Sequence, residues 1–293
     1  MIGLLQFYLK KRFTLFSVGE EYEKAEYIVF GVPFDSTVSF LPGCRFGPLA
    51  VRLFSENIVY PSLAGMHSKI ADLGDLIPSI NVKWMLKRTF KIVDKISSEG
   101  KKPIIIGGEH TLTLASLRAI AKHSDLTTII FDAHLDLLDD HMDSRVNHAT
   151  WLRRFLDKKR GKVVVIGCRD FLEEERKYGE ENLDLIISAD LVHRSLDEVL
   201  EELRGLLKNS ENIYISVDVD VLDVGGRIGV SSPSPNGLTP SQVTRFLEVL
   251  CRKNIIGMDV VEVNPLIDMG ASASYASYFI AYTLSSQKID VGY

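Results

Sequence analysis

The chain has 293 residues, of which 46% are hydrophobic, and a formal net charge of -5. This size and apolar content are ample for a large buried core, in one α/β domain or in two smaller ones. The mild charge, without a basic stripe interleaved with aromatic residues, argues against a nucleic-acid-binding protein.

The chain lacks the marks of a linker, of export and of a membrane segment. No Pro-, Gly- or Ser-rich stretch divides it, so we expect a single domain over residues 1–293. The apolar residues 1–9 precede the basic residues 10–12, which is the reverse of a signal peptide, and no apolar run is long enough to span a bilayer. The cysteines are odd in number and widely spaced, as in reduced cytoplasmic proteins: Cys44, Cys168 and Cys251.

The first third of the chain predicts three elements that pack. A nearly continuous apolar run at residues 26–32 predicts a buried strand. After a loop punctuated by Pro and Gly, residues 48–56 have helical apolar spacing. Apolar residues then recur at spacings of three and four over 81–99, which predicts an amphipathic helix closed by Gly100.

Two strands then end in polar clusters. The strand predicted for 103–106 ends at two glycines that permit a sharp turn and leave His110 to open a helix over 111–122. The strand predicted for 127–131 runs directly into the sequence Asp132-Ala133-His134-Leu135-Asp136. Because alternate side chains of an extended chain share a face, we expect the two carboxylates and the imidazole of this second cluster to converge.

Strand and helix alternate through the remaining sequence. The predicted elements are a strand at 163–167, a helix at 195–207, a strand at 213–219, a helix at 240–251 and a strand at 255–263. The strand at 213–219 carries Asp218 and leads to Asp220, again two residues apart. Such alternation predicts a parallel sheet with helices on both faces and a ligand site at the carboxyl ends of its strands.

The strand ends together offer ligands for metal ions. Carboxylate and imidazole groups without a thiolate suit manganese or zinc. Four carboxylates would balance two divalent cations, and ions roughly 3.5–4 Å apart could share a bridging hydroxide as nucleophile. The plainer alternative for the cluster at 132–136, taken alone, is a polar strand end entering a loop. The six candidate ligands are His110, Asp132, His134, Asp136, Asp218 and Asp220.

The motifs at these strand ends resemble, in order and spacing, the ureohydrolase family of arginases and agmatinases. They are Gly-Gly-Glu-His at 107–110, Asp-Ala-His-Leu-Asp at 132–136 and Ser-Val-Asp-Val-Asp at 216–220. Similarity to the family's terminal signatures at 31–36, 42–48 and 259–265 extends the resemblance over nearly the whole chain. It implies a three-layer α/β/α fold with a mainly parallel sheet of about eight strands. It also implies two Mn²⁺ ions, cleavage of a guanidino group to release urea, and a homo-oligomer, commonly a trimer or hexamer.

The resemblance assigns three catalytic roles. Glu262 would bind the substrate guanidinium, whose planar fork matches a carboxylate, whereas its structural alternative is an ion pair with a core Lys or Arg. His148 would pass a proton to the leaving amine, and the alternative is a loop or helix-capping histidine. Asp136 would serve in catalysis as well as in metal binding. Ala149 departs from the family, which usually has Gly after this histidine.

Several other residues are expected to be structural. The acidic segment 139–143 is interpreted as a solvated loop. We expect surface or packing roles for three histidines and core or interface positions for two tryptophans: His67, His123, His193, Trp84 and Trp151.

Agmatine or N1-aminopropylagmatine is the favoured substrate, and arginine or another guanidino-acid or formimino compound is the alternative. The acidic segment 139–143 would repel a substrate carboxylate and attract an amine, while Phe171 and Leu172 could line a channel for methylenes. Residues 224–233 replace the family's usual loop beside the pocket. A related deacetylase fold is disfavoured because no pair of adjacent histidines occurs. A non-catalytic homologue is disfavoured by the complete ligand set.

Overall fold

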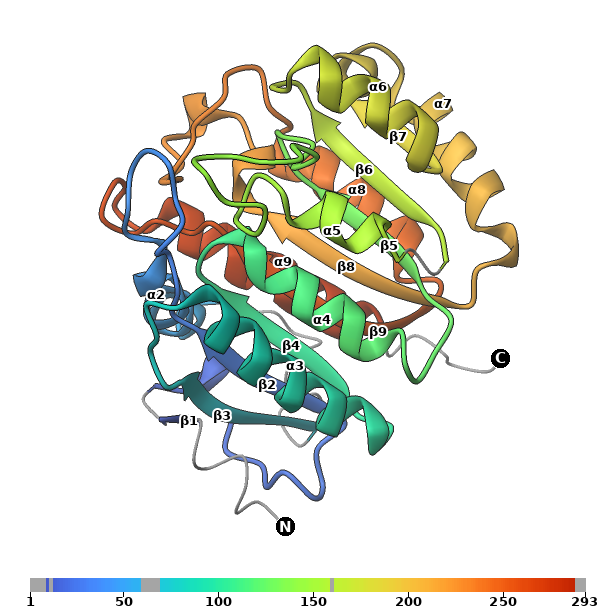
Figure 1. Cartoon of the computed structure of the whole chain (residues 1–293). Coiled ribbons are helices and arrows are strands. Elements are labelled where there is room, and N and C mark those ends of the chain that lie inside the picture. The colour runs from blue at the N-terminus through green and yellow to red at the C-terminus, as the bar shows by residue number, and fades with distance from the viewer. Residues whose placement is uncertain (1–8, 11–12, 59–68, 159–160, 288–293) are drawn as a thin grey trace, which may run out of the picture.

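The computed structural model describes residues 9–10, 13–58, 69–158 and 161–287. Within these ranges nine strands form one sheet in the order β1-β3-β2-β4-β9-β8-β5-β6-β7 (Figure 1). The strands are β1 (Leu9–Lys10), β2 (Tyr27–Val32), β3 (Ile70–Leu76), β4 (Lys102–Gly107), β5 (Thr127–Phe131), β6 (Val163–Cys168), β7 (Leu185–Ser188), β8 (Asn212–Asp218) and β9 (Asn254–Val261). Only β1 pairs antiparallel, so the predicted mainly parallel sheet of about eight strands is confirmed.

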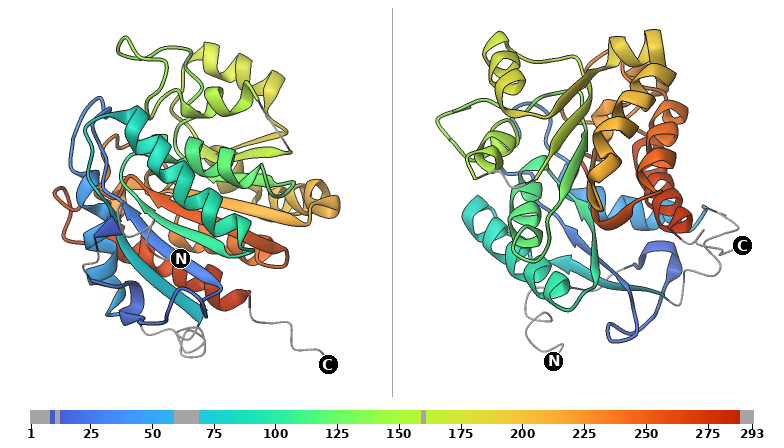
Figure 2. Two further views of the ribbon diagram at one scale, coloured as in Figure 1. Left: turned by 60° about the horizontal axis from the view of Figure 1, so that its bottom comes forward. Right: turned by 90° about the vertical axis from the view of Figure 1, so that its right-hand side faces the viewer.

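Helices cover both faces of the sheet and make three layers (Figure 2). The helices α3 (Val82–Ser98), α4 (Thr113–Ile120), α5 (Trp151–Leu156) and α6 (Glu173–Asn182) lie on one face. The helices α2 (Gly47–Ser55), α7 (Ala189–Leu206), α8 (Pro240–Leu250) and α9 (Ala271–Ser286) lie on the other. None of the described helices is long and apolar enough to cross a membrane.

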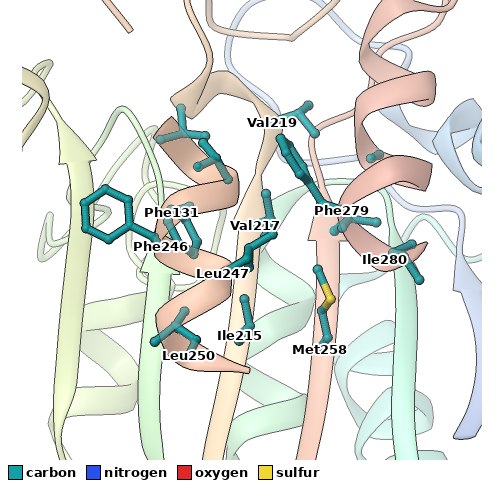
Figure 3. Packing of buried hydrophobic residues seen from close by; sticks show 14 of the residues in the cluster. Phe131, Ile215, Val217, Val219, Phe246, Leu247, Leu250, Met258, Phe279 and Ile280 are labelled. Atoms are coloured by element: carbon teal, nitrogen blue, oxygen red, sulfur yellow. The ribbon is translucent and has the colours of Figure 1, made fainter. Parts of the chain in front are cut away.

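Each face of the sheet has its own hydrophobic core. In β8, Ile215 and Val217 point toward α8 and α9, where they contact the cluster that includes Phe246 and Phe279 (Figure 3). Tyr214, which precedes Ile215, belongs to the core on the other face, beneath α4. This alternation within a fully buried strand is why the sequence shows a continuous apolar run rather than an alternating pattern.

The parallel register brings four strand ends to one edge of the sheet. Ile106 of β4 pairs with Val260 of β9, which pairs with Val217 of β8, which in turn pairs with Phe131 of β5. The residues that follow these four positions therefore emerge side by side. This edge positions the candidate site.

Most predicted elements lie within a few residues of the observed ones, but the sequence did not identify β1, β3, α6, β7 or α9. The predicted strand 255–263 was too long, because β9 ends at Val261 and Glu262 has a φ of 61°. Trp151 is buried as expected, whereas Trp84 is 52% exposed, so that it does not lie in the core and its interface position stays a prediction. His67 lies outside the described residues.

Candidate active site

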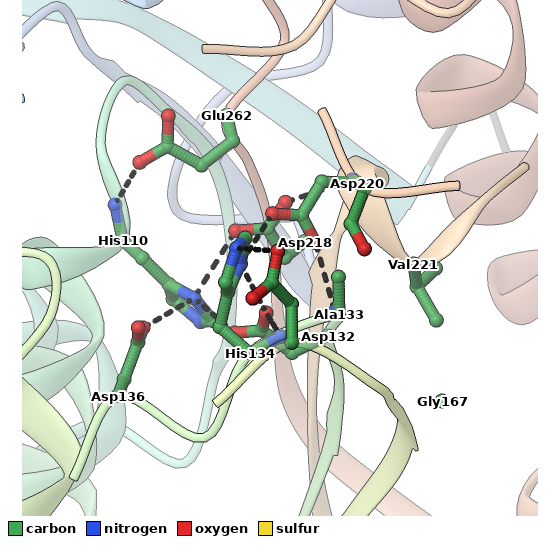
Figure 4. A network of polar contacts seen from close by, with 12 residues as sticks. His110, Asp132, Ala133, His134, Asp136, Gly167, Asp218, Asp220, Val221 and Glu262 are labelled. Atoms are coloured by element: carbon green, nitrogen blue, oxygen red, sulfur yellow. Dashed lines mark hydrogen bonds and ion pairs between the residues drawn. The ribbon is translucent and has the colours of Figure 1, made fainter. Parts of the chain in front are cut away.

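All six predicted ligands gather at the shared strand edge (Figure 4). His110 opens a 3₁₀ turn three residues beyond β4, Asp132 follows β5 directly, and Asp218 is the last residue of β8. The expected reason for the convergence of Asp132, His134 and Asp136 was wrong, because β5 ends at Phe131. The chain leaves the extended conformation there and Asp136 has a left-handed φ of 53°. A bent loop, rather than strand alternation, aims these side chains.

A first ligand group surrounds the buried ring of His110. Its Nδ1 lies 3.0 Å from Asp132, 3.3 Å from Asp218 and 3.4 Å from Asp136, measured to carboxylate oxygens, yet makes no hydrogen bond. The ring of Trp151 packs on that of His110, with centroids 4.6 Å apart, and its Nε1 donates a 2.7 Å hydrogen bond to Asp136 Oδ2. Ring and carboxylate are thereby both held in place.

A second ligand group shares Asp132 with the first. His134 Nδ1 lies 2.9 Å from Asp220 Oδ2 and 3.5 Å from Asp132 Oδ1. Backbone N–H groups orient the carboxylates, since His134 donates to Asp132, Ala133 to Asp220, and Asp220 to Asp218, at 2.7, 2.9 and 2.9 Å. His110, Asp132 and Asp218 can hold one ion, and Asp132, His134 and Asp220 a second.

The spacing and charge of these groups fit divalent ions. An octahedral ion with ligands at about 2.1 Å sets neighbouring ligand atoms about 3 Å apart, which is the range seen here. Burial and the charge of Asp132 raise the pKa of Asp136 to about 7, and burial with Asp220 and Asp132 raises that of Asp218 well above its usual value. Burial acts against charge on His110 and His134, yet the neighbouring carboxylates raise the pKa of both imidazoles well above the usual value, so the cluster attracts positive charge.

Glu262 presents an unpaired oxygen beside the ligands. Its Oε1 accepts a 2.9 Å hydrogen bond from the backbone N–H of His110, whereas Oε2 is buried without a partner. Burial and the neighbouring Glu109 raise the pKa of Glu262 to about 8. No core Lys or Arg among the described residues pairs with it, so the structural alternative for Glu262 has no support.

His148 lies in the same pocket, where its Nε2 is 3.2 Å from Ser39 Oγ and its Nδ1 is buried without a partner. Burial and the nearby His141 lower the pKa of His148 to about 4, which keeps its imidazole neutral at physiological pH. A neutral imidazole can accept a proton and pass it on.

His141 is a pocket residue that the sequence did not reveal. Its ring meets that of His148 edge to face, with centroids 5.6 Å apart, and its Nε2 is buried without a partner. The backbone of His141 exchanges two hydrogen bonds with Ser144 across a tight turn whose central residues, Met142 and Asp143, have φ of 51° and 59°. Such turns normally use Asn-Gly or Asp-Gly, so the sequence gives no usual turn signal.

The acidic rim is made of residues other than those predicted. The acids of 139–143 do not line the pocket, and Asp139 pairs with Arg145 and Arg154 at 2.7 and 2.6 Å. Asp170 and Glu175 line it instead. The segment 139–143 is a solvated loop as interpreted, apart from His141, but it supplies no charge to the pocket.

The pocket is a cavity of about 210 Å³ whose charged lining residues are carboxylates, together with four histidines. Phe171 and Leu172 line it as expected, with Ser231 and Ser232 from the unusual loop. None of the described residues lining it is Lys or Arg. The nearby Arg169 points elsewhere, because its guanidinium donates to backbone carbonyls, including those of Asp220 and Ser234 at 2.8 Å.

Comparison with known proteins places the whole arrangement in context. Residues 25–285 match the model of the Arginase family. The chain is 32% identical to an agmatinase of Pyrococcus horikoshii, covering 82% of this chain and 84% of that protein. It is 31% identical to an N(1)-aminopropylagmatine ureohydrolase of Thermococcus kodakarensis, covering 83% and 84%. The crystal structure of agmatine ureohydrolase of Thermoplasma volcanium superposes with a TM-score of 0.86 at 32% identity, covering 98% and 97%.

Proposed function

The chain belongs to the arginase family, and we propose that within it the chain is a binuclear manganese ureohydrolase acting on agmatine or N1-aminopropylagmatine. Membership makes it a hydrolase of the ureohydrolase type. The proposal adds the ions, the substrate and the role of each residue.

The observation that carries the proposal is the pair of ligand groups that share Asp132 beside the unpaired Oε2 of Glu262. We assign the two groups one Mn²⁺ each, with Asp136 completing the first. When bound, such ions supply a Lewis acid and an activated water for attack on the guanidinium carbon.

The protein's side chains would perform the remaining tasks. The two carboxylate oxygens of Glu262 lie at the pocket wall, where Oε2 is free to accept from an N–H of the guanidinium. As the C–N bond to the substrate chain breaks, the carbon leaves as urea and the departing nitrogen needs one proton. His148 is assigned the transfer of that proton.

The charge of the pocket supports an amine tail over a carboxylate. Beyond the ligands and Glu262, the lining retains two carboxylates, Asp170 and Glu175, and no Lys or Arg among the described residues. A cationic tail is attracted to such a rim, whereas the α-carboxylate of arginine is repelled. Phe171 and Leu172 offer apolar surface for the methylenes between the two charges.

The cellular setting forms part of the same proposal. We place the enzyme in the cytoplasm, in accord with its three unpaired cysteines, and we propose that it is a homo-oligomer by analogy with the family.

Urea release from agmatine, aminopropylagmatine, arginine and guanidinobutyrate by Mn²⁺-loaded protein tests the proposed activity. Release from agmatine or its aminopropyl derivative is expected, and release from none of the four would overturn the assignment.

A further inference from the structure

Behind the metal-ligand groups, on the side away from the pocket, lies a carboxylate that takes no part in them. Asp259, in the middle of β9, is fully buried. Its Oδ2 accepts hydrogen bonds from the hydroxyls of Thr113 and Tyr214 at 2.9 and 2.6 Å, and its Oδ1 accepts one from Ser216 at 2.5 Å. No Lys or Arg in the described part of the chain pairs with it. Burial of a carboxylate whose partners are hydroxyls costs free energy of folding, so we expect a role of Asp259 other than packing.

Ser216 connects this carboxylate to a candidate metal ligand. Its Oγ lies 2.9 Å from Nε2 of His110. A hydroxyl has one proton to donate, and that of Ser216 is directed to Asp259. Toward His110 the hydroxyl can therefore only accept, so Nε2 carries the hydrogen. In the neutral ring the lone pair then lies on Nδ1, the atom that faces Asp132, Asp136 and Asp218.

The other ligand histidine lacks such support. The nearest carboxylate to Nε2 of His134 is that of Asp170, at 4.0 Å, and the Asp170 side chain is 62% exposed. The two ligand groups thus differ in how their imidazoles are fixed. The group around His134 therefore serves as an internal control for a change made behind His110.

We propose that Asp259 is a positioning residue that, through Ser216, holds His110 in the tautomer able to bind a metal ion through Nδ1. The inference rests on the proposed function only in that an ion binds at His110. Groups that orient ligating histidines in this way typically change metal affinity 10- to 100-fold when they are removed.

Replacement of Asp259 by Asn should reverse the direction of the hydrogen bonds that run from His110 through Ser216 to residue 259. The hydroxyls of Thr113 and Tyr214 both need an acceptor, so the amide oxygen faces them and the NH₂ group faces Ser216. Since Ser216 then accepts from the amide, its hydroxyl turns to donate to His110 Nε2. That bond favours the tautomer with hydrogen on Nδ1, which cannot bind an ion.

The test measures binding of Mn²⁺ to metal-free protein by calorimetric titration, with bound metal counted after gel filtration. Asp259→Asn is expected to weaken one of two Mn²⁺ sites by about 10- to 100-fold and to leave the other unchanged. Ser216→Ala should weaken the same site and serves as the second variant should Asp259→Asn fail to fold. Tyr214→Phe is the matched control, because it removes a hydrogen bond from the same carboxylate without touching Ser216.

Two results would overturn the inference. One is an Asp259→Asn or Ser216→Ala protein that binds both ions as tightly as the unaltered chain. The other is a Tyr214→Phe protein that loses as much affinity as Asp259→Asn, since the carboxylate would then act through general stability. The measurement needs no turnover, so a chain that binds two ions but releases no urea would contradict the proposed function and leave this inference to be decided by the variants.

Discussion

The backbone N–H of His110 donates a 2.9 Å hydrogen bond to Oε1 of Glu262, which lies 152 residues further along the chain. One bond therefore fixes the carboxylate assigned to the guanidinium against the turn that carries a metal ligand. Because Oε1 is engaged in this way, only Oε2 remains free to face the pocket. In the proposed function, the backbone beyond the two adjacent strands β4 and β9 would therefore set the distance between the substrate and the ions.

Removal of divalent ions should abolish activity. The buried carboxylates around His110 and His134 have no Lys or Arg partner among the described contacts, so catalysis by these residues requires added positive charge. Prolonged chelation is expected to stop urea release, and Mn²⁺ to restore it. The measurement is urea release against metal content, with Mg²⁺ as the comparison ion. Undiminished urea release by a verified metal-free preparation would contradict the prediction.

His148→Ala should slow turnover without removing metal. Loss of a proton-transfer group is expected to lower kcat by roughly ten- to a thousandfold. Exposed His193, which contacts Asn236 and Gln242 away from the pocket, provides the control His193→Ala, expected to be neutral. Mn²⁺ content and kcat are measured on the same samples. If His148→Ala loses metal instead, the residue is a ligand or a structural histidine.

Glu262→Gln should act mainly on guanidinium binding. A charge-assisted contact becomes a neutral one, which is expected to lower kcat/KM by about ten- to a hundredfold. Glu180→Gln, on the exposed face of α6, is the control for loss of a carboxylate. The two variants are compared by steady-state kinetics on agmatine. An unchanged kcat/KM for Glu262→Gln would exclude the role.

The acidic rim should select an amine tail. Agmatine or its aminopropyl derivative is expected to have a higher kcat/KM than arginine in side-by-side kinetics. Asp170→Asn should lower kcat/KM for agmatine and its aminopropyl derivative by about two- to fivefold, since an exposed charge contributes little. Asp140→Asn, a loop acid outside the pocket lining, should have no effect. The substrate assignment would be wrong if kcat/KM for arginine equalled or exceeded kcat/KM for agmatine and its aminopropyl derivative.

A buried ion pair far from the chemistry should control stability. Arg52 of α2 donates to Asp72 and Asp75 of β3 at 2.8 and 2.5 Å, and its side chain is fully buried. Arg52→Leu leaves two buried carboxylates unpaired, which is expected to cost about 3–5 kcal/mol of unfolding free energy. Denaturant unfolding of the variant measures this, with exposed Arg194→Leu as the control. A loss of unfolding free energy in Arg52→Leu no larger than that in Arg194→Leu would contradict the prediction.

The elements that the sequence predicted well are those whose pattern reflects burial alone. The strands before Asp132 and Asp218 are continuous apolar runs, and their polar endings predicted that the candidate ligands gather at one edge of the sheet, as the structure has them. The strand β3 was not identified because Asp72 and Asp75 interrupt its apolar pattern. Among the described residues their charges are offset by Arg52, a partner that lies beside them once the chain is folded.

The sequence predicted which residues gather at the candidate site better than it predicted their backbone geometry. Asp136 and Glu262 were expected in extended chain, yet both have left-handed φ, which a residue type alone does not signal. His141 was interpreted as part of a solvated loop because acidic segments usually lie at the surface, and its turn contains neither Gly nor Asn to indicate the bend. The acidic rim was assigned to 139–143 because this acidic segment follows the 132–136 motif directly, whereas Asp170 and Glu175 reach the pocket only in the folded chain.

The place of β9 in the sheet has a consequence for synthesis on the ribosome. This strand follows all others in the sequence, yet it lies between β4 and β8 and is the only bridge between the two halves of the sheet. A nascent chain that has not yet delivered residues 254–261 therefore holds two half-sheets with open inner edges, β4 and β8. His110 then belongs to one half and the four aspartate ligands to the other. If two metal ions bind as proposed, the complete ligand set can bind them only after β9 is inserted. Premature termination before this strand should therefore give a protein that exposes aggregation-prone edges and does not bind both metal ions.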